Sequence, residues 1–312
     1  MKTIMNTQVG FLPVAEPVSQ RELLREMNEF QKQGPLARQG ALEVYLGSAP
    51  QMPCVLHEIG RLRELSFRAV GEGTGQPLDT DEYDAHYLHL FLWDAEMKCI
   101  AGAYRIGRTD HLLAEFGPQG LLTATHFQFE QPFLDYLNPG LELGRAFVAP
   151  SHQKSIFALS LLWKGIACFV ARYPRYARLF GTVSISDDYT KISLDLIVKY
   201  MRKSHMNNLL CQWVTASNPY QEIPEDHADI SAQLSSIEQV AARIAEVEPD
   251  GKGVPVLLRQ YLKLNATLLE FNVDADFGNC LDALVLVDLR KAPSAVLMRY
   301  MGKDGLQSFL QS

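Results

Sequence analysis

The sequence predicts a mixed α/β fold of the α+β type, in which a mostly antiparallel central sheet is flanked by helices. Segments with strand-type alternation and segments with helical spacing follow one another as strand, helix, hairpin, strand, buried helix, strand, helix and closing strands. Two of the strands are joined by a tight turn, which favours antiparallel pairing. A doubly wound parallel sheet would require strands and helices in regular alternation, which this chain lacks.

The composition is that of an ordinary globular protein with enough apolar material for a large core. The 312 residues are 47% hydrophobic and 21% charged. A formal net charge of -7 disfavours a general nucleic-acid binder, which would usually carry a basic excess. Residues 1–20 lack a secretory pattern, and the longest apolar run, 156–170, is shorter than the ~20 residues of a membrane span. We therefore expect a cytoplasmic protein whose contact with the inner membrane, if it has one, is peripheral.

No metal-binding pattern is recognisable in the sequence. The five cysteines are scattered and lack the two-residue spacing of a zinc knuckle, which indicates reduced thiols. The glycine loop at 71–75 is not followed by the Lys-Ser/Thr of a phosphate loop. The acidic stretch after it resembles a calcium loop, but Tyr83 stands where a third oxygen ligand is needed. His86 and His89 are spaced too closely on one strand to share a face, so we predict no metal site.

An N-terminal arm is expected at residues 1–40. Within it, residues 18–33 have the pattern of a helix, and Ser19 with Glu22 forms a capping box at its start. We expect this helix to add little to the core.

Residues 41–312 are expected to form one domain, with a helical insertion at about 218–253. Its first elements are a strand at 42–46, a helix at 55–69, a hairpin of strands 86–93 and 99–106, a short helix at 111–115 in a lid-like stretch, and a strand at 141–148. The later elements are a buried helix at 155–170, a strand at 177–185, a helix at 190–203 capped by Asp187 and Asp188, an amphipathic helix running from Ile230 to Ile244, a helix at 255–264, and strands at 267–271 and 283–289.

The strand at 141–148 is the stretch with the most chemistry. It carries an acid, Glu142, and a base, Arg145, and it leads through Pro150 to the buried helix that we expect to start near Ser155. A strand that feeds a helix N-terminus is a natural site for a phosphate-bearing cofactor, because the first turn of a helix presents free N–H groups.

Several motifs occur in order along the chain. They read LHEIGRLRELSFRAVGEGTG (56–75), LDTDEYDAHYLHLFLWD (78–94), GAYRIG (102–107), LELGRAFV (141–148), LLWKGI (161–166) and FGTVSIS (180–186). In this order they closely resemble the acyl-ACP-dependent branch of the GNAT acyltransferase superfamily. That branch includes ornithine-lipid and glycine-lipid synthases, N-acyl amino acid synthases and proteins labelled hemolysin. The resemblance covers residues 41–217 and, less closely, 255–289, and it implies a GNAT-like sheet.

The chain is also similar to the acyl-homoserine-lactone synthases, which have an arginine-rich first helix, an acidic pair before the second strand, an arginine on the third strand and a Glu-x-x-Arg on the fourth. The residues at the matching positions are Arg63, Arg68, Asp81, Asp84, Arg105, Glu142 and Arg145. The similarity implies that Arg63, Arg68, Asp81 and Arg105 contribute to substrate binding.

The resemblance implies an enzyme. It would move a long-chain fatty acyl group from acyl carrier protein, or from CoA, to the amine of an amino acid or an amino-acid-derived acceptor, as in the synthesis of lyso-ornithine lipid or N-acyl amino acids. Ornithine, glycine, other amino acids and a sulfonate are all open as the acceptor. Two other functions are also open: an acyl-homoserine-lactone-type synthase, and a non-catalytic GNAT-like protein that binds an acyl carrier or a lipid. The implied donor is a phosphopantetheine thioester, and no permanently bound cofactor is implied.

A mechanism of this kind needs a base, because only a neutral amine can attack a thioester. Glu142 is the first candidate and Asp84 the second, with Arg145 expected to orient Glu142. Backbone N–H groups of Phe147 and Val148, where the strand should separate from its neighbour, would stabilise the oxyanion.

We expect the phosphopantetheine arm to lie near Lys154 and Ser155 at the start of the buried helix. Most GNAT enzymes have a glycine-containing loop here, and this chain lacks those glycines, which favours a carrier protein over free CoA. Basic residues that could meet the acidic carrier are Arg172, Arg175, Arg178, Lys199, Arg202 and Lys203, and apolar residues that could line an acyl channel are Leu159, Leu162, Trp163, Phe169 and Phe180.

Overall fold

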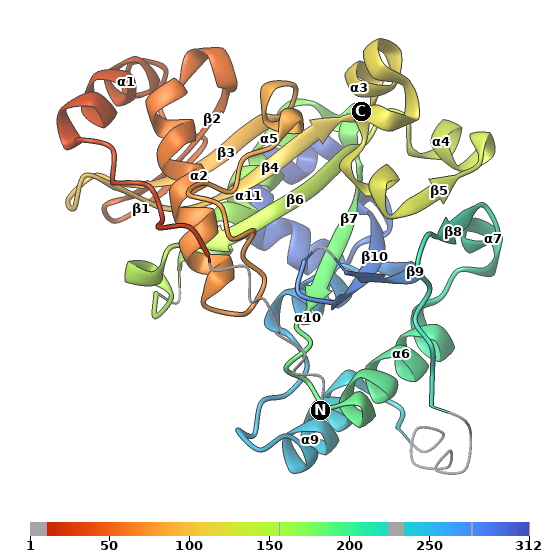
Figure 1. Cartoon of the computed structure of the whole chain (residues 1–312). Coiled ribbons are helices and arrows are strands. Elements are labelled where there is room, and N and C mark those ends of the chain that lie inside the picture. The colour runs from red at the N-terminus through yellow and green to blue at the C-terminus, as the bar shows by residue number, and fades with distance from the viewer. Residues whose placement is uncertain (1–10, 156, 224–233, 276, 312) are drawn as a thin grey trace, which may run out of the picture.

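The computed structural model describes residues 11–155, 157–223, 234–275 and 277–311. An eight-stranded sheet runs through the molecule in the order β1-β2-β3-β4-β6-β7-β10-β9 (Figure 1). All neighbouring strands pair antiparallel except β6 and β7, which are parallel. The predicted α+β class, with a mixed and mostly antiparallel sheet flanked by helices, is confirmed.

Alternating apolar residues form the strands, as the sequence indicates. The sheet strands are β1 (Ala37–Gln39), β2 (Leu42–Ser48), β3 (Leu88–Asp94), β4 (Cys99–Arg108), β6 (Leu141–Val148), β7 (Arg178–Ile185), β9 (Thr267–Asp274) and β10 (Cys280–Asp288). A separate two-stranded sheet joins β5 (Phe127–Phe129) to β8 (Val214–Ala216). The predicted hairpin is β3 paired with β4.

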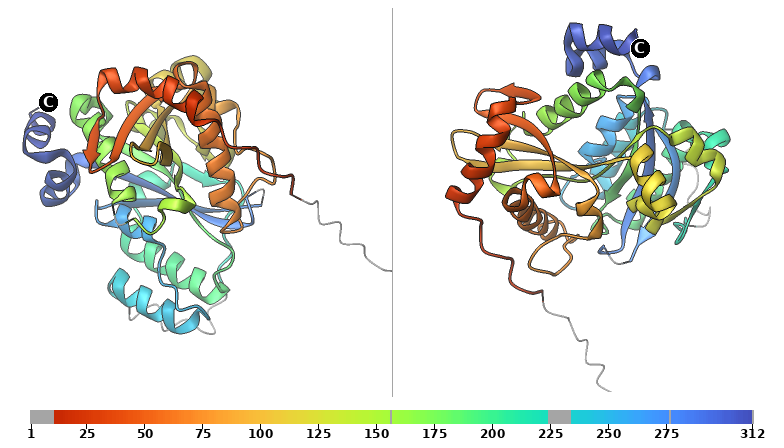
Figure 2. Two further views of the ribbon diagram at one scale, coloured as in Figure 1. Left: turned by 90° about the vertical axis from the view of Figure 1, so that its left-hand side faces the viewer. Right: turned by 90° about the horizontal axis from the view of Figure 1, so that it is seen from above.

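The helices cover both faces of the sheet. Their bounds are α1 (Gln20–Gln33), α2 (Pro53–Arg68), α3 (Thr109–Phe116), α4 (Gln131–Leu137), α5 (Ala158–Arg172), α6 (Lys191–His205), α7 (Asn208–Cys211), α9 (Ile237–Val247), α10 (Val256–Leu262) and α11 (Ser294–Leu310). Helices α1 and α2 lie on one face of β2–β4, α5 lies on the other, and α11 packs on the outside of α5 (Figure 2). None of the helices in these described ranges has the length and apolar character needed to cross a bilayer.

Strand β3 is buried on both faces because helices cover both. Leu90 and Leu92 pack in the core that includes α5, and Phe91 and Trp93 pack in the core under α1 and α2. This second core also contains Leu23, Met27 and Phe30 of α1, so the expectation that the arm helix adds little to the core is wrong. The predicted cap of that helix is correct, since the Ser19 hydroxyl accepts a hydrogen bond from the Glu22 N–H.

Three predicted helix starts differ from the structure. Helix α5 begins at Ala158 and not at Ser155, because residues 150–152 form a separate 3₁₀ turn after β6. Helix α6 is capped by the Thr190 side chain, which accepts from the Ser193 N–H, and not by Asp187 or Asp188. The insertion contains α9, which lies against α6 and begins at Ile237 after a Ser236 cap. Residues 1–10 of the arm and Ile230 lie outside the described residues.

Strands β6 and β7 diverge, and this divergence creates the site. Their parallel pairing is limited to Leu141 with Leu179 and Glu142 with Phe180. Toward Val148, β6 pairs only with β4, whereas β7 keeps its pairing with β10. The separation includes the predicted 147–148 segment but starts about five residues earlier. Strand β6 also has a bulge, in which Arg145 and Ala146 together oppose Tyr104, and Arg145 has a φ of 49°.

The point at which β6 and β7 still touch should be sensitive to added volume. A Cβ atom on Gly181 would lie 2.1 Å from the Leu143 carbonyl oxygen, so Gly181→Ala must push the two strands apart. We expect this substitution to lower the free energy of unfolding by about 1–3 kcal/mol in urea denaturation. The control is Gly144→Ala on β6, where the atom nearest to the added carbon, Leu122 Cδ2, would be 3.8 Å away. Equal stability of the Gly181 variant and the wild type would contradict the prediction.

Candidate active site

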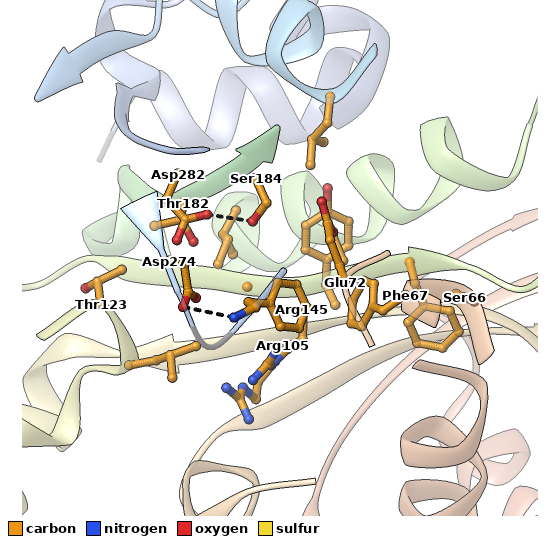
Figure 3. Close-up of a pocket in the computed structure, with 18 of the residues that line it drawn as sticks. Ser66, Phe67, Glu72, Arg105, Thr123, Arg145, Thr182, Ser184, Asp274 and Asp282 are labelled. Atoms are coloured by element: carbon orange, nitrogen blue, oxygen red, sulfur yellow. Dashed lines mark hydrogen bonds between the residues drawn. The ribbon is translucent and has the colours of Figure 1, made fainter. Parts of the chain in front are cut away.

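A cavity of about 620 Å³ occupies the space between the diverging strands. It is lined by β6 from Glu142 to Val148 and by β4, the last turn of α2 and the segment after it, residues 122–126, β7, α10 and the β9–β10 hairpin, together with Tyr87 and Gln153. Figure 3 shows side chains from these elements converging on the same space. The cavity therefore depends on the separation of β6 from β7 and is not a property of one motif.

Glu142 lies at the closed end of this cavity, where the β6–β7 pairing stops. Its side chain is buried, and burial raises the pKa of its carboxyl above the ordinary value. Three donors hold it: the Tyr87 hydroxyl, the Leu122 N–H at 3.1 Å and the Thr123 N–H at 2.7 Å. A rigidly held carboxylate with a raised pKa is a suitable proton acceptor.

Tyr87 and Thr123 are site residues that the sequence reasoning missed. The Tyr87 hydroxyl contacts Glu142 and also accepts a hydrogen bond from the Leu122 N–H at 2.9 Å. Residues 122–126, expected only as a lid-like stretch, fold back over β6 and supply backbone donors to the carboxylate. No local pattern marks these residues, because they reach Glu142 from segments 55 and 19 positions away in the sequence.

The sequence predicts that Arg145 orients Glu142, but in the structure its side chain lies against other acidic residues. Its guanidinium lies 3.7 Å from Asp79 and 3.5 Å from Asp81, and it stacks over the Phe277 ring at 5.2 Å. The bulge at Arg145 and Ala146 interrupts the regular alternation of β6, so the spacing from Glu142 does not fix the direction of the Arg145 side chain. Arg145 still lines the cavity, so its charge is available to a bound anion.

Asp84 belongs to a buried network of ion pairs. Both of its oxygens accept from Arg63, at 3.0 and 2.9 Å, and Oδ1 also accepts from Arg105 at 3.1 Å. Arg105 in turn donates to Asp81 at 2.5 Å. Although burial opposes ionisation, Arg63 and Arg105 hold the pKa of Asp84 well below its usual range. An acid that is ionised and doubly paired is a poor proton acceptor.

Three of the four residues expected to bind substrate do not line the cavity. Arg63 is buried against Asp84. Arg68 pairs with Glu64 at 2.6 Å and fastens the loop after α2 by donating to the Gln76 carbonyl at 2.8 Å. Asp81 serves as a partner of Arg105. Of the four, Arg105 alone is among the residues that line the described cavity.

A second cavity of about 400 Å³ adjoins the first. Val148 and Gln153 line both cavities, so the two lie next to each other at the end of β6. Ser155 lines the second cavity as expected, whereas Lys154 is exposed and lines neither. Lys263 and Arg299, which the sequence reasoning did not select, line this second cavity.

The predicted acyl-channel residues divide into two groups. Leu159 and Trp163 line the second cavity. Leu162, Phe169 and Phe180 are buried in the core and line neither cavity. Phe147 and Val148 line the main cavity, at the edge of β6 that has no strand partner beyond Glu142 among the described strands.

The cavity also has an acidic wall that no motif indicated. It contains Glu72, Asp274 and Asp282, and Figure 3 shows Asp282 hydrogen-bonded to Ser184, at 2.6 Å. Burial, with the neighbouring Asp282 charge, raises the pKa of Glu72 to about 7. Burial, with the neighbouring Asp274 charge, raises the pKa of Asp282 to about 6. His126 lies beside this wall, 3.3 Å from Asp274.

The chain is similar to several known proteins. A family model described as an acetyltransferase (GNAT) domain matches residues 62–164. A protein of Bacteroides thetaiotaomicron called glycine N(alpha)-acyltransferase is 29% identical over 314 residues, which cover 96% of this chain and 91% of that protein. A protein of Phocaeicola vulgatus with the same name is 32% identical over 279 residues, which cover 85% and 84%. A solved structure of a CoA-dependent acyl-homoserine lactone synthase, BjaI, with SAM and isopentyl-CoA, is 14% identical, with a TM-score of 0.40 over 88% of this chain and 100% of that one.

The fold is that of an acyltransferase of the GNAT type. More narrowly, the chain belongs to the N-acyltransferase family that includes the Bacteroides and Phocaeicola proteins. It is an enzyme, and the non-catalytic alternative is set aside.

Proposed function

We propose that the protein transfers a long-chain fatty acyl group from the thioester of acyl carrier protein to the amino group of a small amino acid. The observation that carries this proposal is the pair of adjoining cavities, which share Val148 and Gln153, with the buried Glu142 carboxylate in the lining of the larger one. In the reaction, the amine nitrogen bonds to the acyl carbon, the carbon–sulfur bond breaks, and the phosphopantetheine thiol leaves. One proton must leave the amine nitrogen.

Glu142 is the proposed acceptor of that proton, directly or through the Tyr87 hydroxyl. It lines the cavity, whereas Asp84 does not, and its raised pKa contrasts with the lowered pKa of Asp84. We therefore assign the base role to Glu142 alone. Asp84 and Arg63 would act only by positioning Arg105, whose side chain faces the cavity.

The thioester carbonyl would lie against the free edge of β6. Beyond Glu142 this edge pairs with no described strand, so backbone N–H groups between Leu143 and Val148 can face the cavity. Such donors stabilise the oxyanion that forms when the amine attacks. Phe147 and Val148 are the proposed positions, because Val148 also lies at the junction with the second cavity.

The second cavity is the proposed path of the phosphopantetheine arm. Ser155, Lys263 and Arg299 give it hydroxyl and cationic groups at its lining, which suit a single phosphate. This location differs from the helix start near Lys154 because α5 begins later than the sequence indicated. Since the carrier protein is cytoplasmic, the reaction would take place there.

For the acceptor, glycine is the first candidate, because both named relatives are called glycine N(alpha)-acyltransferases. The cavity contains guanidinium groups, Arg105 and Arg145, that could receive an amino-acid carboxylate. Ornithine and a sulfonate would place additional groups in the same space, and they are the comparison substrates for the test.

The test is a transfer assay with purified protein, with palmitoyl-ACP or palmitoyl-CoA as donor and glycine, ornithine, serine, taurine or homoserine as acceptor. Products are identified by mass spectrometry. We expect N-palmitoyl glycine, formed faster from the carrier protein than from CoA. A lactone product, or no acylated amine from any acceptor, would contradict the proposal.

The proposed phosphate site gives a further prediction. Lys263→Glu or Arg299→Glu should raise the KM for acyl-ACP by about tenfold with little change in kcat, because a charge contact of ~1.4 kcal/mol is lost. Arg172→Glu is the matched control, since Arg172 ends α5 far from its N-terminal turn and lines neither cavity. A larger effect at Arg172 would place the carrier on the basic surface that the sequence suggested.

A further inference from the structure

Three potential metal ligands meet on the acidic wall of the main cavity. His126 precedes β5, Asp274 ends β9 and Asp282 lies on β10, and one ligand atom from each lies within 4.8 Å of the other two. The side chains come from positions far apart in the sequence, so their meeting depends on the fold. The sequence reasoning predicted no metal site because it considered only short spacings.

Asp282 is held in a defined orientation. It is 3% exposed, and both hydrogen bonds that it accepts, from Ser184 at 2.6 Å and from Cys280, reach its Oδ1. Its Oδ2 receives no hydrogen bond from the described residues. This arrangement, in which one oxygen is fixed and the other is left open, is typical of a carboxylate whose second oxygen binds a ligand.

Glu72 is a second and independent observation. It is 9% exposed and lines the same cavity, and the described part of the chain offers its carboxylate no hydrogen-bond donor and no ion-pair partner. The fold fixes it beside the β9–β10 hairpin. Phe67 packs on Phe277 with ring centroids 5.5 Å apart, and a Cβ on Gly278 would lie 2.5 Å from the Gly71 carbonyl oxygen.

Two carboxylates of this wall are not neutralised. Among the described residues, no basic side chain lies within ion-pair distance of Glu72 or Asp282, and the nearby Arg145 (Figure 3) contacts Asp79 and Asp81. Buried carboxylates without cationic partners are costly, and they are usually protonated, paired or bound to a metal.

We propose that His126, Asp274 and Asp282 bind a divalent transition-metal ion, with Glu72 next to the ion. A set of one imidazole and two or three carboxylates suits Zn²⁺ or Mn²⁺ better than a thiolate-preferring metal. This inference goes beyond the proposed acyl transfer and does not depend on it. An ion here would lie in the wall of the cavity in which the acceptor is expected to bind.

The experiment measures binding to the full chain without acyl donor or acceptor. Protein with its affinity tag removed is stripped with a chelator and titrated calorimetrically with Zn²⁺, Mn²⁺ and Mg²⁺, and bound metal is counted by mass spectrometry. We expect one equivalent of Zn²⁺ or Mn²⁺ and a rise in Tm on binding. Asp282→Asn and His126→Gln should each weaken binding by at least about tenfold.

Matched variants separate this site from nonspecific effects. Asp188→Asn removes a nearby exposed acid, 62% exposed, and should leave metal binding unchanged. Because Asn has the shape of Asp and removes a buried charge, stripped Asp282→Asn should unfold at or above the Tm of the stripped wild type. Asp274→Asn serves as the second variant if Asp282→Asn does not fold.

Two outcomes would overturn the proposal. One is the absence of stoichiometric binding of any of the three ions, and the other is equal binding in the wild type and the Asp282 and Asp274 variants. If stripped protein instead binds glycine through Asp282 and takes up no metal, the wall is an ammonium site and the metal proposal is wrong. Since no turnover is measured, these results are independent of whether acyl transfer is found.

Discussion

Glu142→Gln should lower kcat for acyl transfer by about 100- to 10,000-fold, the usual range for loss of a general base. The amide is close in size to the carboxylate, and its oxygen can take the place of the one that Tyr87 and Leu122 contact, which keeps two of the three hydrogen bonds. The lost property is the ability to accept a proton from the attacking amine. The measurement is single-substrate kinetics with saturating acyl-ACP, using release of the carrier thiol as the readout.

The pH dependence of the rate is an independent test of Glu142 as the base. Burial raises the pKa of Glu142, and a protonated carboxyl cannot accept the amine proton. The rate of the wild type should therefore fall as the pH is lowered through this raised pKa, above the ~4.3 of an ordinary glutamate. In Glu142→Gln this fall of the rate at low pH should be absent from the pH–rate profile. The part of the profile that reports ionisation of the amine itself should remain.

Glu130→Gln is the control, because Glu130 precedes α4 and lines neither cavity. Tyr87→Phe tests whether the proton passes through the hydroxyl that contacts Glu142. If Glu142→Gln turns over at the wild-type rate, Glu142 has no part in proton transfer. A lower rate with an unchanged acid limb would mean that Glu142 positions the site and another group is the base.

The strands and helices could be predicted because their signals are local. Alternation gave the β3–β4 hairpin, and helical spacing gave α2 within two residues at its start and one at its end. Where the prediction of α5 failed, the cause was also local: a proline-initiated 3₁₀ turn follows β6, so the helix starts at Ala158. Apolar patterning alone does not separate such a turn from the first turn of a helix.

The partners of the site residues could not be predicted in the same way. Glu142 and Arg145 are three residues apart, and on a regular strand side chains at this spacing point to opposite faces, so the Glu-x-x-Arg motif alone does not bring the two together. The bulge at Arg145 interrupts this alternation, and no residue type in the motif signals a bulge. The acidic wall could not be predicted from the sequence either. His126 and Asp282 are far apart in the sequence, and they come together only in the folded chain, in which β10 pairs with β7.

The second large effect is expected at Asp84, which should matter for stability and not for proton transfer. Asp84→Ala should lower the free energy of unfolding by about 3–5 kcal/mol, because it leaves the buried Arg63 guanidinium without its carboxylate and weakens the anchor of Arg105. Asp84→Asn should cost less, since the amide oxygen can still accept from Arg63. Urea denaturation followed by circular dichroism measures both variants.

The control for Asp84→Ala is Glu29→Ala, which breaks the ion pair between Glu29 and Lys32. Both side chains are 69% exposed, so this substitution should hardly change the free energy of unfolding. The lowered pKa of Asp84 sets how its contribution to the free energy of unfolding depends on pH. That contribution is fully present above the pKa of an unfolded aspartate, ~3.9, and it is lost as the pH falls toward the lower pKa of the folded state. The difference in unfolding free energy between wild type and Asp84→Ala should therefore shrink below about pH 4. A difference that stays constant down to pH 2, or one no larger than that of Glu29→Ala, would show that the buried ion pairs do not stabilise the fold.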